Sequence, residues 1–375
     1  MSIFAAMKFF ASIVIVAAAL ASCKPVPSTG DDGIPVSTLA DVGMDSTLIN
    51  RMTKAIRNHE YSNIHSVLIA RNGKLVYEQY FTGKDEAMGV SIGEVTFDKD
   101  RLHGVRSISK SFVSACVGIA IAQGKIKSVD QSVFDFFPEF EKYKTGDRAS
   151  LTIEHLLSMS SGIHWNEDVP YDNPENSEIQ MTKSGNPVEY VLSQPMDTVP
   201  GAVWKYNGGT TQLLASIIKK VSGQEVDEFA KDNLLTPLGI TNFEWLKFPM
   251  SSMPMAASGL RLRPRDLMKF GLLYYHGGQW NGKQIVPAEW VKTSFETHIA
   301  KLNNEGYGYQ FWIWNNNYHG HEVRMVNAVG NGNQRIFFNK EADLVVVTTA
   351  GDYNQWNLPK HPGTLLGDFI YPSIK

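Results

Sequence analysis

Cysteine is nearly absent from this chain of 375 residues, which has only Cys23 and Cys116. A framework of several disulfides is therefore excluded. Charge is also sparse: charged residues make up 19% of the chain and the formal net charge is −3. This balance excludes the basic face of a nucleic-acid-binding protein and an acidic disordered tail. The sequence has neither a repeat at solenoid or propeller periods nor a low-complexity block.

Apolar residues, by contrast, are abundant. They make up 43% of the chain, with 11% aromatic residues, which is enough for a large core in one big domain or two intertwined ones. Cys116 lies inside the apolar run FVSACVGIAIA, residues 112–122. We interpret it as a small core side chain and not as a nucleophile, because a buried thiol is hard to ionise.

The N-terminus carries its own signal. Lys8 precedes FFASIVIVAAALASC, an apolar run too short to span a bilayer but of the length of a signal peptide. Its last four residues, Leu20 to Cys23, resemble the lipobox of bacterial lipoproteins, in which the cysteine is lipidated. An ordinary secretory signal is the alternative. We predict a signal peptide over 1–22, a flexible tether rich in Pro, Gly, Ser and Asp over 23–43, and a lipid-anchored protein on the periplasmic side of a bacterial envelope.

The remaining chain predicts an α+β domain over 44–375. An amphipathic helix follows Asp45, and two strands are joined by Asn72-Gly73, a strong hairpin signal. Four strand-like runs lie near the other end, at 307–314, 321–330, 333–338 and 343–351. We expect an antiparallel sheet from regions 44–106 and 296–375, flanked by helices, with a mostly helical region over 107–295. A doubly wound fold would need regular alternation of strands and helices, which is missing.

Three serines compete as nucleophiles. Ser91 lies in GVSIG, residues 89–93, which fits the G-x-S-x-G pattern but lacks its strand-to-helix context, so we interpret this segment as a Gly-rich loop. Ser216 and Lys219 match S-x-x-K inside the amphipathic segment QLLASIIKKV, which we interpret as a chance match. Ser107 and Lys110 match the same pattern just before the long apolar run. At that spacing on a helix the lysine amine reaches the serine hydroxyl and can act as its base.

Further motifs follow Ser107 in order: TIEHLLSMSSGI at 152–163, PGAVWKYNGG at 200–209, ASGLRLRPRDLMKFGLLYYHGGQWNGKQIVP at 257–287 and NAVGNGNQRIFF at 327–338. With these motifs, the chain from about residue 45 resembles the serine β-lactamase and penicillin-binding-protein superfamily. It is most similar to the class C-like branch that contains family VIII carboxylesterases and 6-aminohexanoate-dimer hydrolases. The resemblance implies an antiparallel sheet with a helical insertion and catalysis without a metal or organic cofactor.

The resemblance implies roles for single residues. Ser107 would be the acylating nucleophile, Lys110 its base and Tyr206 a proton relay. The family's second motif is Tyr-x-Asn, whereas Gly208 stands two residues after Tyr206. Literal Tyr-x-Asn strings occur at 61–63 and 171–173; the second lies in a loop that resembles a substrate-covering loop, so we expect Tyr171 to contact substrate.

The third motif, normally Lys-Thr-Gly, reads Ala328-Val329-Gly330 followed by Asn331. We expect the backbone amides of Ser107 and Asn331 to form the oxyanion hole. Because Gly332 is so close, the second donor could also be the amide of a residue one or two positions from Asn331. Gly330 and Gly332 would let substrate approach closely. The missing lysine matters because that cation holds a substrate carboxylate; Arg324 lies roughly 13 Å along the strand, too far to replace it.

The sequence therefore predicts a serine hydrolase that cleaves an ester or small linear amide through an acyl-enzyme, with a small-molecule substrate and no nucleic-acid partner. Two alternatives stay open: a D-amino-acid peptidase or β-lactamase-like activity, and a non-catalytic envelope binding protein. We expect no metal site, and interpret HGHE at 319–322 as a turn. Arg261, Arg263, Arg265 and Asp266 are expected to form a structural ion-pair cluster.

Overall fold

The computed structural model describes residues 32–301, 305–318 and 321–375. Its largest feature is an eight-stranded antiparallel sheet in the order β10-β11-β12-β13-β14-β15-β1-β2. The strands of this sheet are β1 (Ile64–Arg71), β2 (Lys74–Tyr80), β10 (Ile299–Ala300), β11 (Gly306–Tyr307), β12 (Trp312–Tyr318), β13 (His321–Gly330), β14 (Gln334–Asn339) and β15 (Leu344–Ala350). All come from the two predicted sheet regions, which confirms the α+β fold.

The two ends of the chain meet at one ladder, where β1 pairs with β15. The turn that joins β1 to β2 contains Asn72 and Gly73 with φ of 53° and 72°, the left-handed values that a two-residue hairpin needs. Along β1, Leu68 and Ala70 face one hydrophobic core and Val67 and Ile69 the other. Both faces of the sheet are thus covered, as the continuous apolar strand requires.

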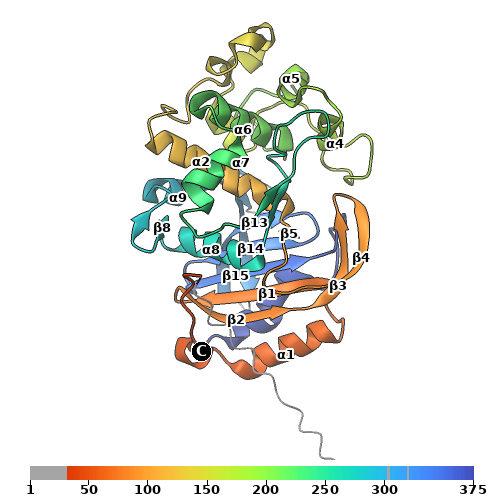
Figure 1. The fold of residues 1–375 in the computed structure, drawn as a ribbon, viewed down its shortest axis with the longest axis vertical. Helices are drawn as coiled ribbons and strands as arrows, with labels where there is room; N and C mark the ends of the chain where they lie inside the picture. Colours follow the sequence, from red (N-terminus) through yellow and green to blue (C-terminus); the bar gives the residue numbers. More distant parts are fainter. Residues whose placement is uncertain (1–31, 302–304, 319–320) are drawn as a thin grey trace, which may run out of the picture.

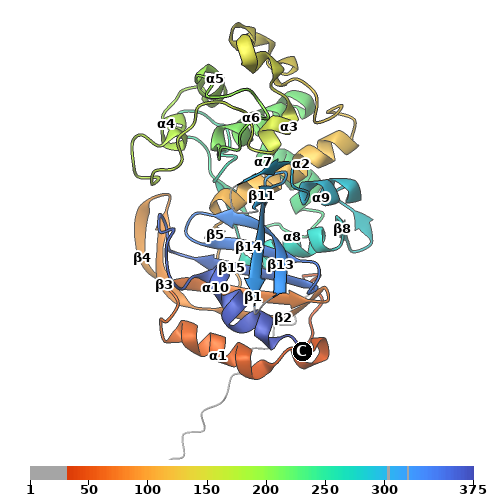
Figure 2. The same ribbon diagram turned by 180° about the vertical axis from the view of Figure 1, so that it is seen from behind.

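The helices divide the molecule into two halves (Figures 1 and 2). In one half, α1 and α10 cover one face of the sheet and α8 the other. The other half contains most of the segment between β5 (His103–Gly104) and β10. The helices are α1 (Ser46–Arg57), α2 (Ser109–Ala122), α3 (Ile153–Leu157), α4 (Ser177–Thr182), α5 (Pro187–Ser193), α6 (Gly208–Ser222), α7 (Val226–Ala230), α8 (Pro264–Tyr275), α9 (Ala288–Ser294) and α10 (Pro362–Leu365).

Small sheets complete the fold. The segment around GVSIG forms a hairpin of β3 (Thr82–Ala87) and β4 (Val90–Thr96), which rises from the side of the sheet toward the half that contains α4 (Figures 1 and 2). The loop expected there is therefore wrong. The other short strands are β5 (His103–Gly104), β6 (Glu244–Trp245), β7 (Leu260–Leu262), β8 (Gln279–Trp280) and β9 (Lys283–Gln284). Among the described residues, no helix has the length and hydropathy to cross a bilayer.

One strand expectation is wrong in detail. The run at 307–314 is interrupted between β11 and β12, because Gln310 takes a φ of +66°. Its side-chain amide donates to the carbonyls of Leu156 and Leu157, each at 3.0 Å. The buried amide thus ties the sheet to the end of α3, and these hydrogen bonds stabilise a break that the aromatic pattern does not reveal.

The tether expectation is also wrong for its described part, residues 32–43. Ile34, Leu39 and Val42 are buried in the two cores, and Asp32 pairs with Arg265 at 2.8 Å. Three apolar residues among the Pro, Gly and Asp are enough to hold the segment on the domain. The expected ion-pair cluster is confirmed, and its further contacts are Arg265 to Glu78 at 2.8 Å, Arg263 to Asp266 at 2.7 Å and Arg261 to Glu244 at 2.6 Å.

Candidate active site

Ser107 and Lys110 lie at the junction of the two halves. Ser107 is in the one-turn helix η2 (Arg106–Ile108), which leads directly into α2. The Lys110 Nζ lies 3.0 Å from Ser107 Oγ and donates a second hydrogen bond to the carbonyl of Ala257, also at 3.0 Å. Lys110 is only 1% exposed. A buried lysine with two fixed hydrogen-bond partners holds the serine hydroxyl in one position, as an activated nucleophile requires.

The turn before the nucleophile is strained. Arg106 has a φ of +52°, a left-handed value that is unfavourable for a residue with a long side chain. Contacts on both sides stabilise it: Ser109 Oγ donates to the Arg106 carbonyl at 2.6 Å, and the Arg106 guanidinium pairs with Glu86 at 2.9 Å. This turn places Ser107 at the edge of the buried apolar helix.

Tyr206 stands beside this pair, as the sequence predicted. Lys110 Nζ lies 4.9 Å from the centre of its ring. Burial raises the pKa of Tyr206, the Glu167 carboxylate adds to the increase, and interaction with the Ser107 hydroxyl opposes it. The phenol is therefore neutral at ordinary pH and can pass on a proton, but does not rest as a phenolate. Trp312 packs against the same ring, with centroids 5.5 Å apart.

Ser107 opens into a pocket of about 140 Å³. Its walls come from the β3–β4 hairpin, from the loop 164–176 with the start of α4, and from the turns after β13 and β15. The lining residues are Glu86, Met88, Gly89, Arg106, Ser107, Tyr171, Asp172, Glu178, Ile179, Thr182, Met255, Ser258, Asn331 and Asn354. The structure thus places Tyr171 and Asn331 in the pocket of Ser107, while substrate contact by Tyr171 and the oxyanion role of the Asn331 amide stay predictions.

The glycines of the third motif lie elsewhere. The pocket-lining part of the described chain includes Asn331 but neither Gly330 nor Gly332. A Cβ on Gly330 would lie 2.3 Å from the Val105 carbonyl, so the glycine lets η2 approach β13. Gly332 has a φ of +85° and packs under the ring of Tyr353. Both glycines therefore serve internal packing, and their predicted contact with substrate stays a prediction.

A pair of carboxylates lies against the altered second motif. A Cβ on Gly208 would lie 2.8 Å from both Glu167 Oε1 and Glu178 Oε2, so a side chain there would have to displace the two acid groups. Glu167 Oε1 accepts hydrogen bonds from Trp165 Nε1 at 2.6 Å and from the Gly208 amide, and its Oε2 accepts from the Tyr171 hydroxyl at 2.7 Å. The two acids thus stand where the asparagine of Tyr-x-Asn would begin.

Of the two acids, Glu178 is the one that lines the Ser107 pocket. It is 4% exposed, and its Oε1 accepts from Ser258 Oγ at 2.6 Å. Its Oε2 has no donor among the described residues. Burial and the Glu167 carboxylate raise the pKa of Glu178 to about 7, while the charge of Lys110 opposes the increase. Sequence reasoning missed both acids, because nothing in the pattern of loop 164–178 indicates that they converge.

The rejected candidates lie outside this pocket. Ser91 is exposed on β4, where its Oγ accepts from the Gly93 amide at 3.3 Å. Ser216 Oγ donates to the Gln212 carbonyl within α6, and Lys219 pairs with Glu225. Cys116 is buried, which raises the pKa of its thiol. Of the turn HGHE, residues 319 and 320 lie outside the described part of the chain.

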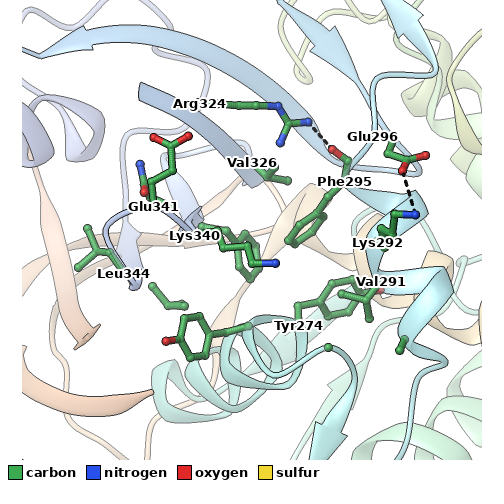
Figure 3. Close-up of a pocket in the computed structure, with 16 residues that line it drawn as sticks. Tyr274, Val291, Lys292, Phe295, Glu296, Arg324, Val326, Lys340, Glu341 and Leu344 are labelled. Carbon is green, nitrogen blue, oxygen red and sulfur yellow. Dashed lines mark hydrogen bonds and ion pairs between the residues drawn. The ribbon is translucent and has the colours of Figure 1, made fainter. Parts of the chain in front are cut away.

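A larger pocket of about 670 Å³ lies beside α8 and α9 (Figure 3). Arg324 points into it and donates to the Phe295 carbonyl, and Lys292 faces Glu296. Its described lining contains a buried tyrosine and lysines but no serine paired with a base. Arg324 is thus directed away from Ser107, in keeping with the prediction that it does not replace the missing lysine.

The antiparallel sheet with its helical insertion has a β-lactamase/transpeptidase-like fold. The serine three residues before a buried lysine is the site motif that goes with this fold. The Beta-lactamase family model matches residues 65–355, so the chain belongs to the beta-lactamase family. It is a hydrolase fold with esterase and amidase neighbours.

Among solved structures, the chain is similar to a Bacillus anthracis protein assigned as a 6-aminohexanoate-dimer hydrolase, with 20% identity, a TM-score of 0.68, and 84% and 80% of the two chains covered. It is also similar to a family VIII carboxylesterase, with 14% identity, a TM-score of 0.65, and coverage of 88% and 97%. A lovastatin esterase of Penicillium rubens is 27% identical over 136 residues, 34% of this chain and 32% of the esterase. The match thus spans about a third of that esterase.

Proposed function

We propose that the protein is a serine hydrolase that cleaves an ester or a small linear amide through an acyl-enzyme on Ser107. The observation that carries this proposal is the 3.0 Å contact between Lys110 Nζ and Ser107 Oγ at the wall of a small pocket. Among the described serines discussed above, Ser107 alone combines such a base with access to a pocket.

In the acylation step, Ser107 Oγ attacks the carbonyl carbon and Lys110 Nζ, 3.0 Å away, acts as the base that takes its proton. The tetrahedral oxyanion is held by the backbone amides of Ser107 and Asn331. When the bond to the leaving group breaks, the neutral phenol of Tyr206 donates a proton to the leaving alkoxide or amine, and Lys110 returns a proton to the phenol. The serine ester and the protonated leaving group are the products.

In the deacylation step, water attacks the serine ester and gives one proton to an acceptor, which passes it to Ser107 Oγ as the acyl bond breaks and the carboxylic acid is released. Glu178 lies in the same pocket with one oxygen free, and its pKa of about 7 lets it accept a proton at neutral pH. We assign it the role of proton acceptor for this water. Neither the Tyr-x-Asn motif nor the S-x-x-K motif of the sequence contains this carboxylate.

The charge of the pocket disfavours anionic substrates. Arg106 is paired with Glu86, and the other charged lining groups, Asp172 and Glu178, are acids. A substrate carboxylate, of the kind that β-lactams and D-Ala-D-Ala peptides carry, would lack a free cation there. The names of the similar proteins, a carboxylesterase and an aminohexanoate-dimer hydrolase, agree with an ester or linear amide.

The first test is labelling with a fluorophosphonate probe, with the adduct mapped by mass spectrometry and Ser107→Ala as the control. An adduct on Ser107 that disappears in the variant supports the proposal, whereas an adduct on Ser91 contradicts the choice of nucleophile. Nitrophenyl esters, aminohexanoate oligomers, D-amino-acid amides and a chromogenic cephalosporin then distinguish the substrate classes. Absence of both labelling and turnover would favour the non-catalytic binding protein.

The N-terminal segment supports a second proposal, export and anchoring through Cys23, which lies outside the described residues. The support is the apolar run and the lipobox-like residues 20–23. Expression in a bacterial host followed by mass spectrometry of the mature N-terminus tests it: a diacylglyceryl-modified Cys23 is expected, and an unmodified N-terminus at another residue would contradict it.

A further inference from the structure

Two buried histidines face each other at the base of the β3–β4 hairpin. His65 of β1 and His103 of β5 are 0% and 1% exposed. Nδ1 of His65 lies 2.8 Å from Nε2 of His103. An oxygen of the Asp85 carboxylate, on β3, completes a set of three ligand atoms that all lie within 4.8 Å of one another. Such a convergence of two imidazoles and a carboxylate needs a physical explanation.

The hydrogen-bond partners of the outer nitrogen show which nitrogen of each ring carries the hydrogen. His65 Nε2 is 3.1 Å from the Lys84 carbonyl and 3.3 Å from Asn63 Oδ1. The Asn63 amide is oriented by a two-point pair with the Lys84 backbone, so Oδ1 is indeed an acceptor. His103 Nδ1 lies 3.0 Å from the Gly104 carbonyl. Because all three neighbours only accept, both outer nitrogens carry hydrogen.

A neutral imidazole has only one N–H, so the two inner nitrogens present lone pairs to each other across 2.8 Å. A cation between them would remove this repulsion. A shared proton would satisfy the two nitrogens only. A metal ion would use both lone pairs and the carboxylate of Asp85 at once, since metal-bound histidine is neutral and a carboxylate is a common third ligand.

We propose that His65, Asp85 and His103 bind one divalent transition-metal ion, with zinc the best match to two imidazoles and one carboxylate. Two nitrogens bound at 2.0–2.1 Å to a tetrahedral ion lie about 3.3 Å apart, so the rings would separate by about half an ångström. The surrounding hydrogen bonds fit this role: each histidine donates outward to a carbonyl, and the Tyr353 hydroxyl donates to Asp85 Oδ1 at 2.7 Å.

The site would position the wall of the Ser107 pocket. Beyond Asp85, the hairpin carries Glu86 and Met88, which line that pocket and contact Arg106 at 2.9 and 2.7 Å. The ring of Tyr353, bonded to Asp85, lies 4.5 Å from the Arg106 guanidinium carbon. An ion at Asp85 therefore holds the hairpin and the strained turn together. Its ligands are positioning residues and touch no substrate.

The test is the metal content of the full chain, purified without a metal-affinity step, dialysed against zinc chloride and then against metal-free buffer. Inductively coupled plasma mass spectrometry should find about one zinc per chain, and less than about a tenth in Asp85→Asn and His103→Gln. His164→Gln is the matched control, because His164 pairs with Asp197 on the surface; it should retain the metal. Zinc should also raise the Tm of the wild type over a chelator-treated sample, but not that of Asp85→Asn.

Wild-type protein that is folded by circular dichroism and retains less than about a tenth of an equivalent of zinc would overturn the proposal. Retention of equal zinc by wild type and Asp85→Asn would also overturn it. Asp85→Asn removes one charge and leaves both rings in place. Its zinc content therefore tests the proposal even if His103→Gln does not fold. The readout needs no substrate, and its outcome is independent of the hydrolase proposal.

Discussion

Glu178→Gln should change how the stability of the protein depends on pH. The carboxyl is buried, its Oε2 has no donor among the described residues, and its pKa is raised from an ordinary 4.5 to about 7. Between pH 4.5 and 7, the carboxyl is therefore protonated in the folded protein and ionised in the unfolded chain. The stability from this group is complete below pH 4.5 and is lost as pH rises toward 7.

The magnitude follows from the shift. A difference of roughly 2.5 pKa units at 1.36 kcal/mol each corresponds to about 3 kcal/mol of unfolding free energy. Glutamine stays neutral, its oxygen can still accept from Ser258, and its amide can donate to Glu167. The variant should match the wild type near pH 4.5 and be more stable by up to about 3 kcal/mol at pH 8.

The assay is urea unfolding of both proteins at half-unit steps from pH 4.5 to 8. The control is Glu94→Gln, a change of the same chemistry at an exposed position on β4, which should leave the pH dependence as it is. If the difference between Glu178→Gln and wild type does not change with pH, the acid is not perturbed in the way inferred here. Loss of turnover in the stabilised variant would agree with its proposed role in deacylation.

Two further substitutions test the site. Tyr206→Phe keeps the ring that packs on Trp312 but removes the proton donor, so single-turnover acylation should slow by about 10²–10⁴-fold with little change in KM; an unchanged rate would remove Tyr206 from the relay. Gly330→Ala would place a Cβ 2.3 Å from the Val105 carbonyl and should destabilise the protein by about 1–3 kcal/mol, with fluorophosphonate labelling of Ser107 reduced. Normal labelling would show that η2 does not depend on this close approach.

Local sequence signals predicted the fold well where one interaction dominates. Asn72-Gly73 determines its hairpin because the turn needs left-handed residues. Ser107 and Lys110 meet because their spacing alone places them on one side of a helical turn. In both cases the relevant atoms are within three residues, so tertiary contacts do not alter the outcome.

The failures involve partners far apart in sequence. Gln310 interrupts an aromatic strand because its amide finds carbonyls more than 150 residues away. Glu178 is in the pocket because Asn176 caps α4, accepting from the Glu178 amide at 3.0 Å, and so fixes its helical turn beside Gly208. His65 and His103 meet across 38 residues. No single-chain pattern contains these pairings, so only the structure reveals them.

The two departures from the family motifs have a common effect on charge. The third motif has Ala328 in place of a lysine, and the second has Gly208, which lies against Glu167 and Glu178. A cation is thus lost and an ionisable acid gained around one nucleophile. We expect esters matched in length but differing in a terminal group to be cleaved in the order amine, amide, carboxylate, because the carboxylate meets Glu178 without a counter-ion. The ratio of kcat/KM between the amine and carboxylate esters should fall in Glu178→Gln and on acidification below pH 7, where Glu178 is protonated. A ratio that is unchanged by both would show that the pocket does not select by charge, and substrate choice would then depend on its shape alone.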